Sequence, residues 1–214
     1  MIQESQIEQL STFANPLPPG KKMSYEEFLD WLDEDTYAEW VNGVVVFMSP
    51  ISIEHQNVTG FLLSLIRIFV ETHQLGVVFY EPFQMKTGPD LPGRSPDIIF
   101  VDNDNFSRLK NAHLEGPADL VVEVVSPESR IRDRGEKFYE YEQGGVCEYW
   151  LIDPLRKQAE FYQRGEDGIY RVMPINNDGI FRSAVLEGLW LKVDWLWQEP
   201  LPLLLNVLKE WGLV

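Results

Sequence analysis

The chain has 214 residues, of which 44% are hydrophobic, and it carries a formal net charge of −16. This length and composition predict one folded domain with a substantial core and argue against a largely disordered chain. The negative charge argues against a protein that coats nucleic acid non-specifically, but it is compatible with an enzyme that binds nucleic acid through a local basic patch and a metal.

Three features bear on cellular location. No apolar run is long enough to span a bilayer, which argues against a membrane protein. The N-terminus lacks the basic start and the apolar segment of a signal peptide. Cys147 is the single cysteine, so no internal disulfide can form, and we expect a protein of the reducing cytoplasm.

The chain begins with a polar segment, 1–22, which contains three prolines and which we interpret as an arm. A single domain is expected over 23–214. Ser24 and Glu27 form a capping box, which predicts a helix that continues to Leu32.

A hairpin and a long helix are expected next. Asn42-Gly43 lies between two apolar runs, which predicts a type I′ turn that joins strands over 37–41 and 44–48. Apolar residues at helical spacing then predict a helix over 53–74.

The rest of the chain alternates strands and helices. One strand is expected over 77–85, with Pro82 marking an edge or a bulge. The near-continuous apolar run over 148–153 predicts a central strand that is parallel to a neighbour. The other expected elements are apolar strands over 95–101 and 118–125, a helix over 131–143, a meander over 158–163 and 168–172, and a C-terminal helix over 203–211. This order indicates an α/β or α+β fold, with helices around one central mixed β-sheet.

Two of the apolar strands carry one carboxylate each. Asp97 opens the run over 95–101, and Glu123 lies inside the run over 118–125. An ionised carboxylate among apolar side chains costs several kcal/mol unless it is paired or bound to a cation. Because Mg²⁺ often takes one or two carboxylates together with water and phosphate oxygens, the pair indicates metal-assisted hydrolysis, with phosphodiesters as the natural substrate class.

Six motifs occur in order along the chain. They are Tyr37-Ala-Glu-Trp-Val-Asn-Gly43, Ser49-Pro-Ile-Ser-Ile-Glu-His55, Ser95-Pro-Asp97, Asp119-Leu-Val-Val-Glu-Val-Val-Ser-Pro127, Asp133-Arg-Gly-Glu-Lys137 and Gly145-Val-Cys-Glu-Tyr-Trp-Leu-Ile-Asp-Pro154. Together they resemble the PD-(D/E)XK nuclease superfamily and, more closely, the Uma-type family of putative restriction endonucleases. The resemblance covers most of the chain and implies a restriction-endonuclease-like core, a Mg²⁺ or Mn²⁺ cofactor and endonuclease activity on DNA.

The resemblance also implies a metal site. Asp97 corresponds to the "PD" aspartate and Glu123 to the first acidic residue of "(D/E)XK", and both would hold the metal together with the carbonyl of Val124. Glu39 is similar to an additional metal-binding glutamate of the superfamily. The residues alone leave other readings open: a turn aspartate at Asp97, a buried ion pair at Glu123 and a solvent-facing strand glutamate at Glu39.

The sequence departs from the superfamily pattern at its lysine. Val125 occupies the position two residues after Glu123, where the lysine is expected. Lys137 is the best replacement, because it follows Asp133 by four residues on one helix face and could be aimed at the site from there. The alternative is an ordinary Asp133–Lys137 surface pair. Lys86 is a weaker candidate for the same role.

Further residues have accessory roles in this interpretation. His55 would act as a base or a phosphate contact, with a structural role as the alternative, and Glu81 and Asp133 would also face the site. The candidate nucleic-acid contacts, which could equally solvate a helix face, are Arg94, Arg130, Arg132 and Arg134.

Two classes of function remain after this reading. The first is a metal-dependent endonuclease, expected to be a homodimer because nucleases that cut both strands often dimerise. The second is a catalytically inactive module for binding or assembly on the same fold. The acidic charge, the missing lysine at Val125 and the tryptophans late in the chain favour this second class. A small-molecule phosphohydrolase lacks support, because the chain has no glycine-rich loop that would cradle a phosphate.

Overall fold

The computed structural model describes residues 22–33 and 36–214, so the predicted arm, apart from Lys22, lies outside the described residues. Its largest sheet is built from β3 (Gly76–Tyr80), β6 (Ile98–Asp102), β8 (Leu120–Val124), β9 (Glu148–Asp153), β10 (Gln158–Arg164) and β11 (Tyr170–Val172). The spatial order is β11-β10-β9-β8-β6-β3. β8 and β9 run parallel and the other neighbours run antiparallel, which confirms the predicted mixed sheet and the parallel pairing of the central strand β9.

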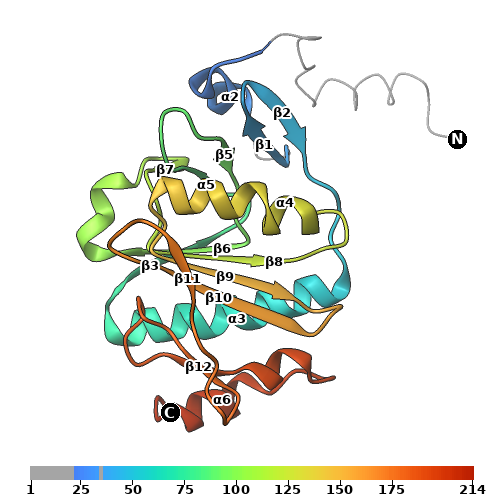
Figure 1. Ribbon diagram of the computed structural model, residues 1–214, viewed down its shortest axis with the longest axis vertical. Coiled ribbons are helices and arrows are strands. Elements are labelled where there is room, and N and C mark those ends of the chain that lie inside the picture. Colours follow the sequence, from blue (N-terminus) through green and yellow to red (C-terminus); the bar gives the residue numbers. More distant parts are fainter. Residues whose placement is uncertain (1–21, 34–35) are drawn as a thin grey trace, which may run out of the picture.

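Helices cover both faces of this sheet (Figure 1). α3 (Ile53–His73) lies on one face, and α4 (Arg130–Arg134) and α5 (Glu136–Gly144) lie on the other. Alternate residues of β8 follow these layers. Val122 packs in the cluster that contains the α3 side chains, and Val121 packs in the cluster that contains Tyr141 of α5. Because side chains alternate along a strand, Glu123 projects toward the face that carries α5.

A second sheet lies beyond the ends of the first and carries the N-terminal hairpin (Figure 1). Its strands are β1 (Ala38–Val41), β2 (Val44–Phe47), β4 (Gln84–Lys86), β5 (Gly93–Arg94) and β7 (His113–Glu115), in the spatial order β2-β1-β5-β4-β7. Asn42 and Gly43 both have positive φ, 53° and 87°, as the predicted type I′ turn requires. The predicted capping box also forms, because Ser24 N donates to Glu27 and Glu27 N donates to Ser24 at the start of α2 (Tyr25–Trp31).

The apolar run over 77–85 is two strands in two different sheets, and the expectation of one strand is wrong. β3 forms an edge of the six-stranded sheet, as Pro82 suggested, whereas β4 belongs to the second sheet. Pro82 lies between them and has no backbone N–H for a ladder hydrogen bond. The chain therefore leaves one sheet and enters the other at this point.

The helix expected over 131–143 is likewise divided into α4 and α5 at Gly135. A Cβ atom at Gly135 would lie 2.8 Å from the carbonyl oxygen of Ile131, so a side chain would not fit without a shift. α5 ends in a glycine cap, because Gly145 has a φ of 94° and donates its N–H to Tyr141 O.

The C-terminal part packs on the side of α3 that is away from the sheet (Figure 1). It contains β12 (Ile180–Arg182), β13 (Trp190–Lys192), η2 (Val193–Trp197) and α6 (Leu204–Glu210). The other 3₁₀ segment, η1 (Asn103–Arg108), lies between β6 and β7. Trp195 is buried in the main core and its ring centroid lies 5.4 Å from that of Trp190. These late tryptophans thus contribute to the core.

Candidate active site

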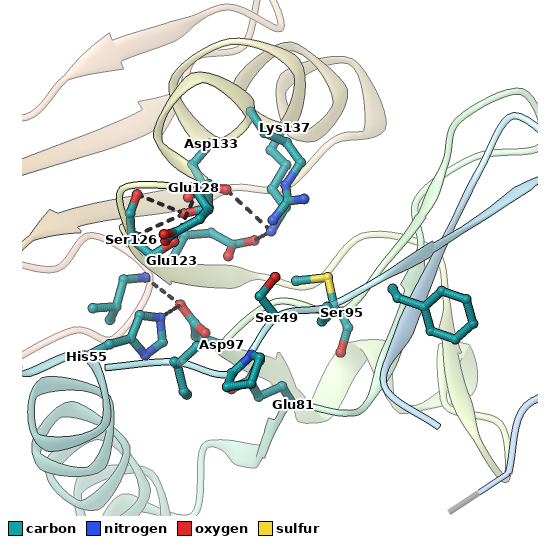
Figure 2. A pocket seen from close by; sticks show the side chains of 17 residues that line it. Ser49, His55, Glu81, Ser95, Asp97, Glu123, Ser126, Glu128, Asp133 and Lys137 are labelled. Carbon is teal, nitrogen blue, oxygen red and sulfur yellow. Dashed lines mark hydrogen bonds and ion pairs between the residues drawn. The ribbon is translucent and has the colours of Figure 1, made fainter. Parts of the chain in front are cut away.

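The two carboxylates singled out from the sequence meet at the end of β8. β6 and β8 are antiparallel with Ile98 opposite Val122, and one further step along this register brings Asp97 opposite Glu123. The backbone N–H of Val124 donates a hydrogen bond to Asp97 Oδ2, which fixes the aspartate against the end of β8. Figure 2 shows both carboxylates directed into the same pocket.

The pocket is a cavity of about 80 Å³ with an acidic lining. Among the described residues, its acidic side chains are Glu81, Asp97, Glu123, Glu128 and Asp133. Two side chains that are cationic at neutral pH, Arg132 and Lys137, line it as well. The surplus of carboxylates makes the cavity favourable for a cation.

Lys137 reaches this cavity from α5 (Figure 2). Its side chain is 2% exposed, and Nζ lies 2.8 Å from Glu123 Oε1. The same ammonium lies 3.5 Å from Glu39 Oε1 and 3.5 Å from Asp133 Oδ1, so the pair with Asp133 exists but is buried rather than at the surface. Burial alone would lower the pKa of Lys137, but the surrounding carboxylates, Glu123 first, hold it above its ordinary value. The lysine is therefore a buried, protonated cation.

Opposing effects act on the pKa of Glu123. Burial, assisted by the charges of Asp133 and Asp97, raises its pKa to about 8, although Lys137 opposes this effect. Tyr141 donates its hydroxyl to Glu123 Oε1 at 2.6 Å. A further cation beside this carboxyl would favour its charged form and bring the pKa down.

His55 and Glu81 lie on the other side of Asp97 (Figure 2). His55 is in the first turn of α3, with Nε2 3.4 Å from Asp97 Oδ2 and Nδ1 3.3 Å from the hydroxyl of Thr59. Burial lowers the pKa of His55, but the contact with Asp97 outweighs it and the pKa is raised. The pKa of Glu81 is raised by burial and by the charge of Asp97.

Glu39 is fully buried and is absent from the lining of the cavity. Its Oε2 accepts a hydrogen bond from Arg94 at 2.9 Å, and its Oε1 faces both Lys137 and the backbone N–H of Ser95. Burial raises the pKa of Glu39, but Lys137 and Arg94 more than compensate and the pKa is lowered. Both oxygens are thus occupied by cations and donors of the chain itself, which differs from the metal-binding position implied by the resemblance.

The four arginines expected to contact nucleic acid have different environments. Arg94 is 2% exposed. Its guanidinium donates two hydrogen bonds to the carboxylate of Glu140, each of 2.8 Å, and one to Glu39. It is therefore not accessible to a ligand. Arg130 lies 3.3 Å from Asp153 and Arg134 pairs with Glu160. Of the four, Arg132 lines the cavity.

Lys86, the weaker lysine candidate, lies elsewhere. Its Nζ donates to the carbonyls of Gly88 and Pro89 at 3.0 and 3.1 Å and lies 4.6 Å from the ring centroid of Trp40. The position that carries the lysine in the superfamily, Val125, is buried in the cluster on the α5 face. Lys137 therefore supplies the ammonium that neither of these two positions provides.

Tyr141, which lies outside the six motifs, is a further residue of the site. Its hydroxyl hydrogen bond to Glu123 makes it part of the site as well as of the core. The available signal was its spacing, because Tyr141 follows Lys137 by four residues and lies on the same helix face. Sequence reasoning gave no indication of the pairing of Arg94 with Glu140.

The donor set fits a hard divalent cation. Within residues 22–33 and 36–214, no group of three or more His, Cys, Asp or Glu side chains is arranged to hold a metal ion. Asp97 and Glu123 offer two carboxylates, and Val124 lines the same cavity. A two-carboxylate site completed by a carbonyl, water and substrate oxygens suits Mg²⁺ or Mn²⁺ and does not suit a structural zinc ion.

The fold is shared with a solved structure. The crystal structure described as "a putative nuclease belonging to DUF820" from Anabaena variabilis matches with a TM-score of 0.66 and 18% sequence identity, over 81% of this chain and 97% of that one. The likeness shows a common mixed α and β fold.

The family follows from the sequence itself. The model of the Uma2 family, described as "Putative restriction endonuclease", matches residues 25–194, and the chain therefore belongs to this family. An uncharacterized protein of Synechocystis sp., slr1290, is 25% identical over 167 residues, which are 74% of this chain and 83% of that protein. Across the described residues, no helix has the length and apolar character needed to cross a membrane.

Proposed function

We propose that this protein is a metal-dependent endonuclease that hydrolyses phosphodiester bonds in DNA. The observation that carries the proposal is the convergence of Asp97, Glu123 and Lys137, from three separate segments, on one acidic cavity. Hydrolysis of a phosphodiester needs oxygen ligands for a divalent cation and a fixed positive charge near the developing negative charge. This combination, together with membership of the Uma2 family, supports a nuclease.

Asp97, Glu123 and the carbonyl of Val124 would hold Mg²⁺ or Mn²⁺. When bound, such a cation lowers the pKa of a water ligand and offsets charge on the phosphate. The raised pKa of Glu123 supports this assignment, because a carboxyl that is reluctant to ionise alone gains most from a neighbouring cation.

Lys137 would replace the lysine of the superfamily. Its ammonium holds a proton 2.8 Å from Glu123, where it can orient the attacking water or stabilise charge on the phosphate oxygens. Glu39 and Asp133, each 3.5 Å away, keep the lysine charged and fix its direction. His55 would position Asp97 through its Nε2, 3.4 Å from the carboxylate.

The experiment is a cleavage assay on plasmid DNA, single-stranded DNA and RNA, with Mn²⁺, with Mg²⁺ and with EDTA. We expect DNA cleavage in either metal and none in EDTA, and loss of cleavage in Asp97→Asn with folding intact by circular dichroism. Sedimentation of the same samples measures whether the protein is the proposed homodimer.

Absence of cleavage under every condition, together with absence of Mn²⁺ binding by calorimetry, would contradict the proposal. That result would favour the inactive module for binding or assembly. Cleavage of RNA but not of DNA would support the proposed active site and would make RNA the substrate.

A further inference from the structure

Arg132 differs from the two arginines beside it in α4. Arg130 pairs with Asp153, and Arg134 pairs with Glu160. Arg132 lines the cavity, and it forms no hydrogen bond or ion pair with any part of the chain that the structure describes. Its Nε is buried without a partner; Nε of Arg134 is also unpartnered, but that guanidinium is held by Glu160, whereas no other atom of the described chain holds the guanidinium of Arg132. A buried donor without an acceptor calls for an explanation, and a ligand group that enters the cavity supplies one here.

Three of the five carboxylates that line the cavity have other partners. Glu123 and Asp133 face Lys137, and Asp97 accepts from the backbone of Val124. Arg132 forms no ion pair with the remaining two, Glu81 and Glu128, in the described part of the chain, so its donors are available to a molecule that enters the cavity. The guanidinium is also within electrostatic range of Lys137, so two positive charges flank the same space.

The backbone that carries Arg132 is fixed at its start. Ser126 N donates to Ser129 Oγ at 3.0 Å, and Ser129 N donates to Ser126 Oγ at 3.1 Å. This reciprocal pair joins the segment after β8 to the start of α4, the helix that carries Arg132. A rigid, planar fork of N–H donors in this position suits two oxygens of one phosphate.

We infer that Arg132 is the phosphate-binding group of this cavity and that it takes the non-bridging oxygens of a phosphodiester. The identity of the ligand as a nucleic-acid phosphate rests on the proposed function. The chemistry alone would also accept inorganic phosphate, and the two sources can be separated by experiment.

The first test measures DNA binding at a series of salt concentrations by fluorescence anisotropy, in Ca²⁺, which takes the same oxygen ligands as Mg²⁺. Gel analysis verifies that the DNA stays intact. Each phosphate contact contributes about 0.9 to the slope of log K against log salt for duplex DNA. We expect Arg132→Gln to lower the slope by about this amount and to weaken binding about tenfold.

Two further variants sharpen the result. Arg132→Lys keeps the charge but not the fork, so it should retain the slope and bind less tightly than the wild type. Arg182→Gln changes an exposed residue of β12 and makes the same change in net charge. Its DNA affinity and its slope should match those of the wild type. An unchanged slope in Arg132→Gln, or an equal loss in Arg182→Gln, would overturn the inference.

A second measurement separates this inference from the proposed function. Inorganic phosphate is titrated into the labelled protein while the Nε–Hε resonance of Arg132, assigned with Arg132→Gln, is followed by NMR. If the wild type binds no DNA but this resonance shifts, the nuclease proposal fails and the phosphate site stands. If the wild type binds no DNA and the resonance does not move, the phosphate site fails as well.

Discussion

Replacement of Lys137 by methionine should destabilise the protein strongly. The ammonium is 2% exposed and lies 2.8 Å from Glu123 and 3.5 Å from both Glu39 and Asp133. Its removal leaves three buried carboxylates that face one another without their shared cation. Removing one partner of a buried ion pair typically costs about 3–5 kcal/mol, and we expect Lys137→Met to fall in this range.

Urea unfolding followed by circular dichroism, in EDTA, measures this loss directly. Lys209→Met is the matched control, because Lys209 is exposed on α6 and its replacement should stay within about 0.5 kcal/mol of the wild type. A double variant, Asp133→Asn with Lys137→Met, removes one of the buried charges that has lost its partner and should be more stable than Lys137→Met alone. A loss below about 1 kcal/mol in Lys137→Met, or no recovery in the double variant, would refute the reasoning.

Four further predictions concern the buried carboxylates. Mn²⁺ affinity should rise with pH up to about 8, with proton release on binding, because Glu123 must ionise to ligate. Since the folded state holds this proton more tightly than the unfolded chain, the metal-free protein should lose stability as pH rises from 4.5 toward about 8, and Glu123→Gln should reduce that dependence. Glu39→Gln should bind Mn²⁺ as the wild type does by calorimetry but cleave DNA more slowly, and a tenfold loss of affinity would instead make Glu39 a metal ligand. Glu148→Gln should lower the free energy of unfolding by about 1–3 kcal/mol. The reason is that the buried carboxylate of Glu148 accepts hydrogen bonds from Trp150 Nε1 and from the backbone N–H groups of Ala184 and Val185. A melting temperature unchanged from the wild type would contradict this prediction.

The sequence predicted those elements whose signals are local. The capping box at Ser24 and the turn at Asn42-Gly43 depend on residues within four positions of each other, and both form as expected. The strand over 148–153, apolar between its terminal Glu148 and Asp153, also indicated its central, parallel place, because a strand buried on both faces favours such a near-continuous apolar composition.

The misses arose where the deciding contact is distant. Pro82 marks a break within 77–85, but nothing in this segment says that β3 and β4 belong to different sheets, because that depends on their distant strand partners. Arg94 looked available for phosphate, but its partners Glu39 and Glu140 are 55 and 46 residues away. The placement of Glu39 behind Lys137, rather than in the cavity, depends on the same long-range pairing.

The central claim is that Asp97, Glu123 and Lys137 form one metal-dependent nuclease site. The most direct test compares initial rates of plasmid cleavage in Mn²⁺ for the wild type, Asp97→Asn and Lys137→Met, each verified as folded. We predict cleavage by the wild type and at least a hundredfold loss in both variants, as expected when a metal ligand or a charge-stabilising group is removed. Cleavage by either variant at the wild-type rate would contradict the claim.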